Sequence, residues 1–222
     1  MTTRVLLIRH GATVLSAEDR FAGSTDVELS DEGRRQARCL GERIAAEIDA
    51  IYVSPMKRTR ETASLVTGGA LEPLVEAGLR EIDHGRWEGL TRKEVEQRFP
   101  EEYGAWEEDP FTFAPAGGEA GVAVMARSLP VIRSIVVAHP EQTVAVVSHK
   151  ATIRLLLSSL LGIDPRGYRD RLDQAPACLN VLDFKDPVRA RLMVYNDTSH
   201  YAEGRVGVRP AGAGLSKWWD PK

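Results

Sequence analysis

Three apolar runs in the sequence are each followed closely by basic or nucleophilic side chains. The runs span residues 5–8, 50–53 and 143–147, and the side chains that follow them are Arg9, His10, Arg58 and His149. Short apolar runs without alternation are typical of strands buried on both faces. Because ligands of open α/β sheets bind beyond the carboxyl ends of the strands, we expect these four side chains to meet at one sheet edge.

Two guanidinium groups and two imidazoles suit the chemistry of a phosphate monoester. Arg9 and Arg58 would hold the dianionic phosphate, since a guanidinium fork matches the geometry of its oxygens. A neutral imidazole can attack phosphorus in line and form a phosphoramidate that water hydrolyses. The other imidazole, if protonated, can stabilise charge on the transferring group. This chemistry requires no metal ion, and we predict neither a metal site nor a cofactor.

One further group is needed, because an alkoxide leaving group must receive a proton. A carboxyl group with a raised pKa is a common donor. The segment from Leu79 to Gly89 offers three carboxyl groups. Glu81 is the first candidate, and Asp83 and Glu88 are close enough in sequence to be rivals.

The motifs, taken in order, resemble the histidine phosphatase superfamily, which includes cofactor-dependent phosphoglycerate mutases and many small-molecule phosphatases. The resemblance covers about residues 5–200 and rests on Arg9-His10-Gly11-Ala12-Thr13, Arg20-Phe21-x-Gly23, Ser54-Pro55-Met56-Lys57-Arg58-Thr59, Leu79-Arg80-Glu81 through Trp87-Glu88-Gly89, and Val147-Ser148-His149-Lys150. It implies that His10 is the phosphorylated nucleophile and Glu81 the proton donor. It also implies that Arg9, Arg58 and His149 form the phosphate pocket.

The sequence departs from the family pattern near the predicted pocket. Ser16 stands where an Asn often completes the phosphate contacts, and Lys150-Ala151 replaces the usual Gly-Gly after the second histidine. With Gly23, Ser16 and Lys150 complete the predicted substrate-binding set. A cation at Lys150 favours a substrate with a second anionic group, a hypothesis that a surface-pointing Lys150 would contradict.

Three activities are compatible with these motifs. The family's mutases carry an Arg-x-Tyr-Gly-x-Leu pattern after the acid, whereas residues 82–89 are of the phosphatase type. This difference favours a metal-independent phosphomonoesterase that acts on a small-molecule phosphate. A phosphoglycerate mutase and a non-catalytic regulatory member are the alternatives, although no main pocket residue is missing.

Composition excludes several other classes of protein. The 222 residues carry a net charge of -3, with both signs mixed along the chain, which argues against nucleic-acid and anionic-membrane partners. The two cysteines belong to no CxxC pair, so neither a disulfide framework nor a structural zinc site is expected. No stretch resembles a signal peptide or approaches the length of a membrane span. We expect a cytoplasmic protein.

The alternation of strands and helices predicts an α/β fold. We expect a three-layer sandwich with a mostly parallel central sheet and helices on both faces, as in phosphoglycerate mutase-like proteins. Further strands are predicted over residues 179–184 and 191–195, and a helix over 153–161. Residues 1–222 are interpreted as one histidine phosphatase domain.

Local signals predict where several helices begin and end. Ser30 should cap one helix, and Ser54-Pro55 should start the next, with Ser at the N-cap and Pro in the first helical position. Thr91 and Glu94 form a capping box for a helix that Pro100 ends.

The remaining segments fit the layers less well. Pro130 should kink or interrupt a helix over residues 121–137. The aromatic segment at about 99–115 is predicted to be an inserted lid over a small-molecule site. The glycine-rich tail at about 202–222, with its two tryptophans, either wraps the surface or contacts a second subunit, which leaves room for a homodimer.

Overall fold

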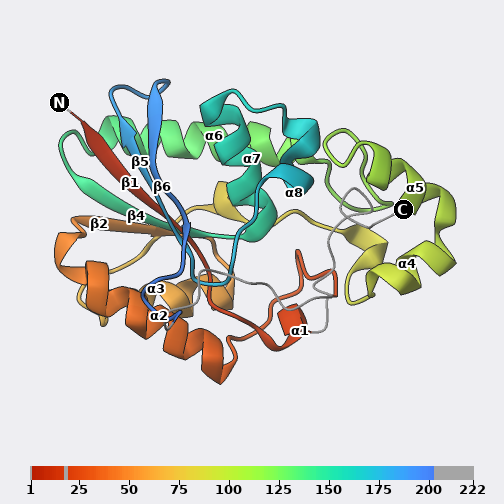
Figure 1. Cartoon of the computed structure of the whole chain (residues 1–222), viewed down its shortest axis with the longest axis horizontal. Helices are drawn as coiled ribbons and strands as arrows, with labels where there is room; N and C mark the ends of the chain where they lie inside the picture. Colours follow the sequence, from red (N-terminus) through yellow and green to blue (C-terminus); the bar gives the residue numbers. More distant parts are fainter. Residues whose placement is uncertain (1, 18–19, 203–222) are drawn as a thin grey trace.

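The computed structural model describes residues 2–17 and 20–202, without the side chains of residues 16 and 17. A six-stranded sheet with the order β3-β2-β4-β1-β5-β6 forms its centre (Figure 1). The strands are β1 (Thr3–Arg9), β2 (Ala50–Val53), β3 (Leu74–Val75), β4 (Thr143–Ser148), β5 (Leu179–Phe184) and β6 (Ala190–Asp197). Strands β1 to β4 run parallel to one another, and β5 and β6 pair antiparallel, so the predicted, mostly parallel sheet is confirmed.

Helices cover both faces of this sheet, as predicted (Figure 1). Successive side chains of β1 point to opposite faces, because strand side chains alternate. Leu6 and Ile8 pack with α2 (Asp31–Ile44) and α3 (Lys57–Thr67). Val5 and Leu7 pack with α6 (Gly121–Ala138) and α7 (Lys150–Leu161). The shorter helices are α1 (Val14–Ala17), α4 (Arg92–Arg98), α5 (Pro100–Glu108) and α8 (Tyr168–Arg171), with 3-10 turns at Ala45–Glu47, Ala77–Leu79, Gly85–Trp87 and Pro165–Gly167.

Two of the three predicted helix starts are confirmed. The Ser30 side chain accepts a hydrogen bond from the Gly33 N–H at the start of α2, and Thr91 and Glu94 form the capping box of α4. The start at Ser54 is wrong, because α3 begins at Lys57, whose N–H donates to the Asp26 carboxylate at 2.8 Å. The Ser54 hydroxyl is engaged elsewhere, at a histidine ring of the site described below.

Helix α6 continues through Pro130, so the predicted interruption is wrong. Pro130 lies on the exposed side, where water can reach the carbonyl that loses its N–H partner. The buried side of α6, including Ile132 and Ile135, packs against α7 and the sheet. By length and composition α6 is also apolar enough to cross a membrane, so the expectation that no run approaches such a span is wrong as well. We interpret α6 as a core helix, because its buried side chains belong to the main hydrophobic core.

The aromatic segment forms a separate hydrophobic cluster beyond the sheet. Helix α4 ends before Pro100, as predicted, and Pro100 then begins α5. Tyr103 and Trp106 of α5 pack with Phe21 and the fully buried Trp87. In Figure 1, α4 and α5 lie together at the end of the molecule away from the sheet. The predicted lid therefore has its own core.

The structure does not test the predictions about the C-terminal tail and the homodimer. The tail predicted at about 202–222 lies, from residue 203 onward, outside the described residues, and the homodimer that it suggested stays a prediction.

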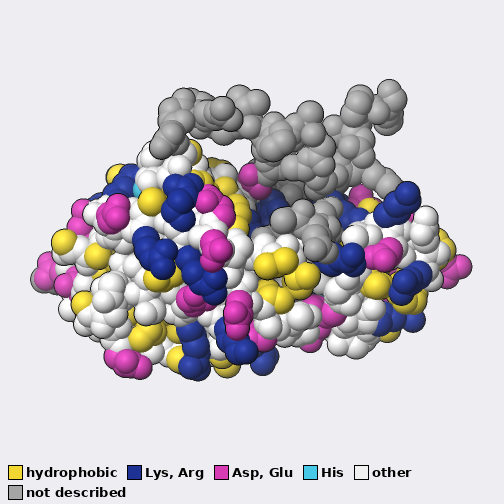
Figure 2. Space-filling model, turned by 90° about the horizontal axis from the view of Figure 1, so that it is seen from below, with side chains coloured by type: hydrophobic (Ala, Val, Ile, Leu, Met, Phe, Trp, Pro, Cys, Tyr) yellow, Lys and Arg dark blue, Asp and Glu magenta, His cyan; other side chains and the backbone are white. Residues whose placement is uncertain are grey.

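On the face shown in Figure 2, basic and acidic side chains are interspersed, which agrees with the mixed charges along the sequence.

Candidate active site

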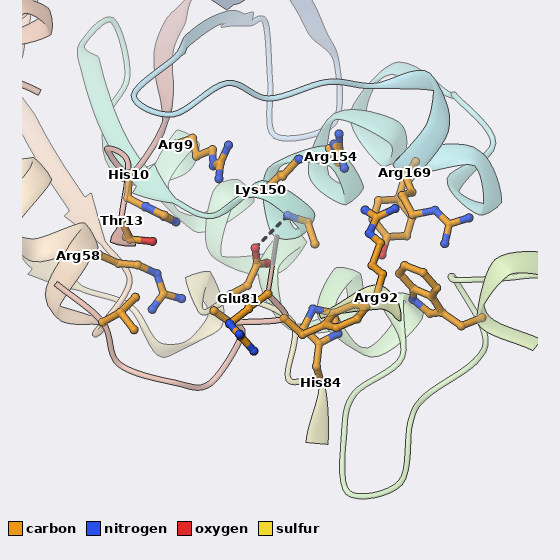
Figure 3. Close-up of a pocket in the computed structure, with 17 residues that line it drawn as sticks. Arg9, His10, Thr13, Arg58, Glu81, His84, Arg92, Lys150, Arg154 and Arg169 are labelled. Carbon is orange, nitrogen blue, oxygen red and sulfur yellow. Dashed lines mark hydrogen bonds between the residues drawn. The ribbon is translucent and has the colours of Figure 1, made fainter. Parts of the chain in front are cut away.

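Five of the predicted side chains line one cavity at the carboxyl ends of β1 and β4, namely Arg9, His10, Arg58, Glu81 and Lys150, whereas His149 is fully buried and does not line it. Arg9 pairs in register with Ser148 across the two parallel strands, and the rings of His10 and His149 lie 5.2 Å apart, centroid to centroid. Arg58 arrives from the first turn of α3. The cavity has a volume of about 180 Å³, and Figure 3 shows the side chains that line it.

The His10 ring is oriented by its neighbour in the chain. Its Nδ1 lies 2.8 Å from the Gly11 carbonyl oxygen, which can only accept, so Nδ1 carries the proton and Nε2 the lone pair. Burial, followed by the charges of Arg9 and Arg58, holds the pKa of His10 well below 6.5. Gly11 itself packs so closely on the Gly33 backbone that a Cβ would clash with it. His10 is therefore a neutral imidazole in a fixed tautomer.

Arg58 and His149 are hydrogen-bonded to each other. Arg58 Nε donates to His149 Nδ1 at 3.2 Å, and its two Nη atoms donate to the carbonyl oxygens of Thr25 (2.8 Å) and Gly23 (2.9 Å). His149 Nε2 therefore carries its proton and donates to Ser54 Oγ at 2.8 Å. Burial and then Arg58 hold the pKa of His149 well below 6.5. The expected protonated imidazole is not found in this arrangement.

The rival carboxylate Glu88 secures a backbone loop. It accepts hydrogen bonds from the N–H groups of Gly23 (2.9 Å), Ser24 (3.0 Å), Thr25 (3.2 Å) and His84 (3.1 Å). The Thr25 hydroxyl adds a bond of 2.6 Å. We predicted that Gly23 binds substrate. Its N–H instead donates to Glu88, and its carbonyl oxygen accepts a hydrogen bond from Arg58 and so supports the site.

Glu81 is the one acidic side chain that lines the cavity within the described residues. Its carboxylate accepts hydrogen bonds from the N–H groups of Ala151 and Thr152, each at 3.1 Å, in the first turn of α7 (Figure 3). The N-terminus of a helix favours negative charge at this position. The other rival, Asp83, instead accepts from Ser24 Oγ at 3.2 Å and the Gly85 N–H at 2.8 Å.

The wall beside Glu81 is strongly basic. Lys150 lines the cavity between Arg9 and Arg154 (Figure 3), so the surface-pointing orientation that would contradict its predicted role is not observed. Burial, followed by the charges of Arg154 and Arg9, lowers the pKa of Lys150 to about 7. Arg9 donates to the Gln174 carbonyl oxygen at 2.6 Å.

Sequence reasoning missed several residues of the cavity. They are Arg20, Phe21, Arg92, Trp106, Arg154, Tyr168 and Arg169. Arg154 could have been found, because it lies four residues after Lys150 on the same helix face. The predicted substrate contact Ser16 lies in α1, and its side chain is outside the described part of the structure. Residues 2–17 and 20–202 hold no group of three or more side chains arranged to bind a metal ion.

Comparison with known proteins identifies the family. Residues 5–198 match the histidine phosphatase superfamily (branch 1). The chain belongs to this superfamily. This histidine phosphatase is similar to phosphoserine phosphatase 1 of Hydrogenobacter thermophilus, with 36% identity over 163 residues that cover 72% of this chain and 77% of that protein. It is also similar to the glucosyl-3-phosphoglycerate phosphatase of Mycolicibacterium vanbaalenii, with 34% identity over 169 residues that cover 72% and 75%.

Solved structures agree with the assignment and with the phosphoglycerate mutase-like fold. Bacillus stearothermophilus YhfR is 33% identical, with a TM-score of 0.83 over 89% of this chain and 98% of that chain. The mycobacterial glucosyl-3-phosphoglycerate phosphatase with inorganic phosphate is 32% identical, with a TM-score of 0.77 over 90% and 99%. The histidine phosphatase described here is accordingly a phosphoric monoester hydrolase for small phosphorylated substrates.

Proposed function

We propose that this histidine phosphatase hydrolyses a small-molecule phosphate monoester through a phosphohistidine on His10, without a metal ion. The observation that carries the proposal is the bond from His10 Nδ1–H to the Gly11 carbonyl oxygen. It leaves the Nε2 lone pair on a neutral ring beside two guanidinium groups, which is the form a nucleophile requires.

In the first step, His10 Nε2 attacks phosphorus while the bond to the leaving oxygen breaks. The guanidinium groups of Arg9 and Arg58 neutralise the phosphoryl oxygens, and because both are already held by protein carbonyl oxygens, little reorganisation is needed. His149 positions Arg58 through the bond to its Nε, and the other ring nitrogen of His149 is engaged by the Ser54 hydroxyl.

Glu81 supplies the proton that the leaving alkoxide needs. In its protonated form this carboxyl group, which lines the cavity together with His10 and Arg58, can donate to the leaving oxygen. After the alcohol leaves, the Glu81 carboxylate takes a proton from water, which attacks phosphorus and breaks the N–P bond. Phosphate is released, and His10 returns to its neutral form.

The dimensions of the cavity support a small substrate. A volume of about 180 Å³ lies below the usual range of ligand pockets, about 300 Å³ and more. Trp106 brings the 99–115 segment to the cavity, and we propose that this segment acts as a lid on a single domain. Phosphoserine and glucosyl-3-phosphoglycerate, named for the relatives, are the first candidates to test. Both cysteines are free thiols, which fits a cytoplasmic enzyme.

The test is phosphate release from p-nitrophenyl phosphate and metabolite phosphates in EDTA. We expect wild-type activity to survive EDTA and to be lost in His10→Ala, while the matched control His139→Ala, outside the cavity, keeps it. Acid quenching during turnover should trap an acid-labile phosphoryl group on wild type and not on His10→Ala. Equal activity of wild type and His10→Ala would disprove the mechanism. Isomerisation of phosphoglycerate without net phosphate release would instead identify a mutase.

A further inference from the structure

The cavity carries more positive charge than one phosphate group requires. Within the described residues, its walls hold seven cationic side chains and one acidic one, Glu81; the cations are Arg9, Arg20, Arg58, Arg92, Lys150, Arg154 and Arg169. A phosphate monoester brings about two negative charges, which Arg9 and Arg58 suffice to neutralise. The surplus of basic groups needs a separate explanation.

Some of the outer cations are balanced by the protein itself. Arg169 contacts Glu107 at 3.0 Å and lies over the Trp106 ring at 4.1 Å from the centroid. Arg20 lies 3.4 Å from Glu94. These contacts fix the two side chains as structural parts of the wall.

Lys150 and Arg154 are less well compensated. Arg154 is almost completely buried, and its Nη2 contacts the partly exposed Asp173 at 3.3 Å. Its Nε has no hydrogen-bond partner among the described residues, and neither has Arg9 Nε. Lys150 has no hydrogen bond or ion pair within residues 2–17 and 20–202. The buried Nε–H groups of Arg9 and Arg154 are costly without acceptors, which suggests that a ligand supplies them; Lys150 is partly buried and faces the same cavity.

The arrangement of these groups points to a single site. Lys150 and Arg154 are four residues apart on α7 and therefore lie on the same face. Figure 3 shows Lys150 between Arg9 and Arg154 on one wall of the cavity. The basic wall thus extends from the phosphate-binding end, at Arg9, to a second cluster one helical turn along α7.

We propose that Lys150 and Arg154 form a second anion subsite, and that the preferred substrate is a phosphate monoester whose carbon skeleton bears another anionic group. A carboxylate or a second phosphate would satisfy the donors of this subsite. The inference rests on the proposed function, because it takes the phosphoryl group to be bound between His10, Arg9 and Arg58. The second anion would then fix the orientation of the leaving group.

Matched substrates test this subsite. 3-Phosphoglycerate and glycerol 3-phosphate differ by a carboxylate in place of a hydroxymethyl group, and 1,3-propanediol bisphosphate and monophosphate differ by a second phosphate. In at least one pair, we expect kcat/KM to be about tenfold or more higher for the substrate that carries the second anionic group. A charge-assisted hydrogen bond in a site with little water would account for a difference of this size. The pair that shows the preference identifies the second anion.

Variants of Lys150 connect the preference to the subsite. Lys150→Met should remove most of the preference, measured as the ratio of kcat/KM between the two substrates of a pair. Lys150→Arg should keep most of the preference. The control is Lys185→Met, because Lys185 is exposed and lies outside the cavity. We expect this variant to keep the wild-type kcat/KM for every substrate.

The outcomes separate the two proposals. If wild type turns over p-nitrophenyl phosphate with His10 but prefers neither charged substrate, the second subsite is disproved and the proposed function stands. The same conclusion follows if Lys150→Met slows all substrates equally. If p-nitrophenyl phosphate is not hydrolysed at all, the proposed function fails, and this inference fails with it.

Discussion

Replacing Glu88 by glutamine should impair catalysis, although Glu88 lies outside the cavity. Its carboxylate holds the backbone N–H groups of residues 23–25, and the carbonyl oxygens of Gly23 and Thr25 in turn hold the Arg58 guanidinium. Glutamine keeps one carbonyl oxygen and replaces the other with an NH₂ group. That group cannot accept from a backbone N–H, so part of the loop loses its anchor.

The size of the effect follows from the bonds that are lost. At the Oε2 position, glutamine removes the acceptor of the Thr25 N–H (3.2 Å) and the negative charge that strengthens the other bonds. Losing one or two charge-assisted hydrogen bonds in this half-exposed loop should lower the free energy of unfolding by about 1 to 3 kcal/mol. Displacement of Arg58 should reduce kcat/KM by about 10- to 100-fold, the range caused by small errors in positioning.

The assay must separate a positioning role from proton donation. p-Nitrophenolate leaves without a proton, whereas an alkoxide needs one. We therefore expect Glu88→Gln to reduce kcat/KM equally for p-nitrophenyl phosphate and an alkyl phosphate, and to raise the inhibition constant of inorganic phosphate. Glu61→Gln is the control, because it removes only a half-exposed ion pair with Arg34. It should leave both rates unchanged.

Two results would refute this reasoning. Wild-type kcat/KM in a destabilised Glu88→Gln protein would mean that Arg58 does not depend on the loop. A loss confined to the alkyl phosphate would make Glu88 the proton donor and would overturn the assignment of Glu81.

Two further predictions concern proton transfer and pH. Glu81→Gln should slow alkyl phosphates by about 10²- to 10³-fold and p-nitrophenyl phosphate far less; equal losses would remove Glu81 from the donor role. The free energy of unfolding, measured with urea, should fall as the pH drops below 6.5. Burial lowers the pKa of His10, His84 and His149, so these rings stay neutral when folded and take up protons when unfolded. His10→Ala should flatten this slope, and an unchanged slope would contradict the neutral assignment.

Signals that depend on near neighbours in the chain predicted the fold well. Ser30 caps α2 because its hydroxyl meets an N–H three residues later, a relation visible in the sequence. Ser54 failed as a cap for the opposite reason. Its hydroxyl bonds to His149, 95 residues away, and only the folded sheet brings them together.

The same distinction between local and long-range contacts separates the site residues that the sequence predicts from those that it does not. Residues that follow strands directly, such as His10 and His149, were predictable because the strand register alone places them. The far walls of the cavity were not, since Trp106 and Arg169 arrive through packing between helices of different segments. Glu81 was chosen over Glu88 by resemblance, and the hydrogen bonds of the two carboxylates supply the physical difference between them.

The position of β1 in the sheet has a consequence for biosynthesis. This first strand lies between β4 and β5, so its neighbours begin at residues 143 and 179. At about 5–20 residues per second, a ribosome needs on the order of ten seconds or more to deliver them. During that time the apolar run of β1, residues 5–8, lacks both of its partner strands and is exposed to aggregation or to chaperones. The pairing that creates the active site is thus the step at which the nascent chain most needs protection.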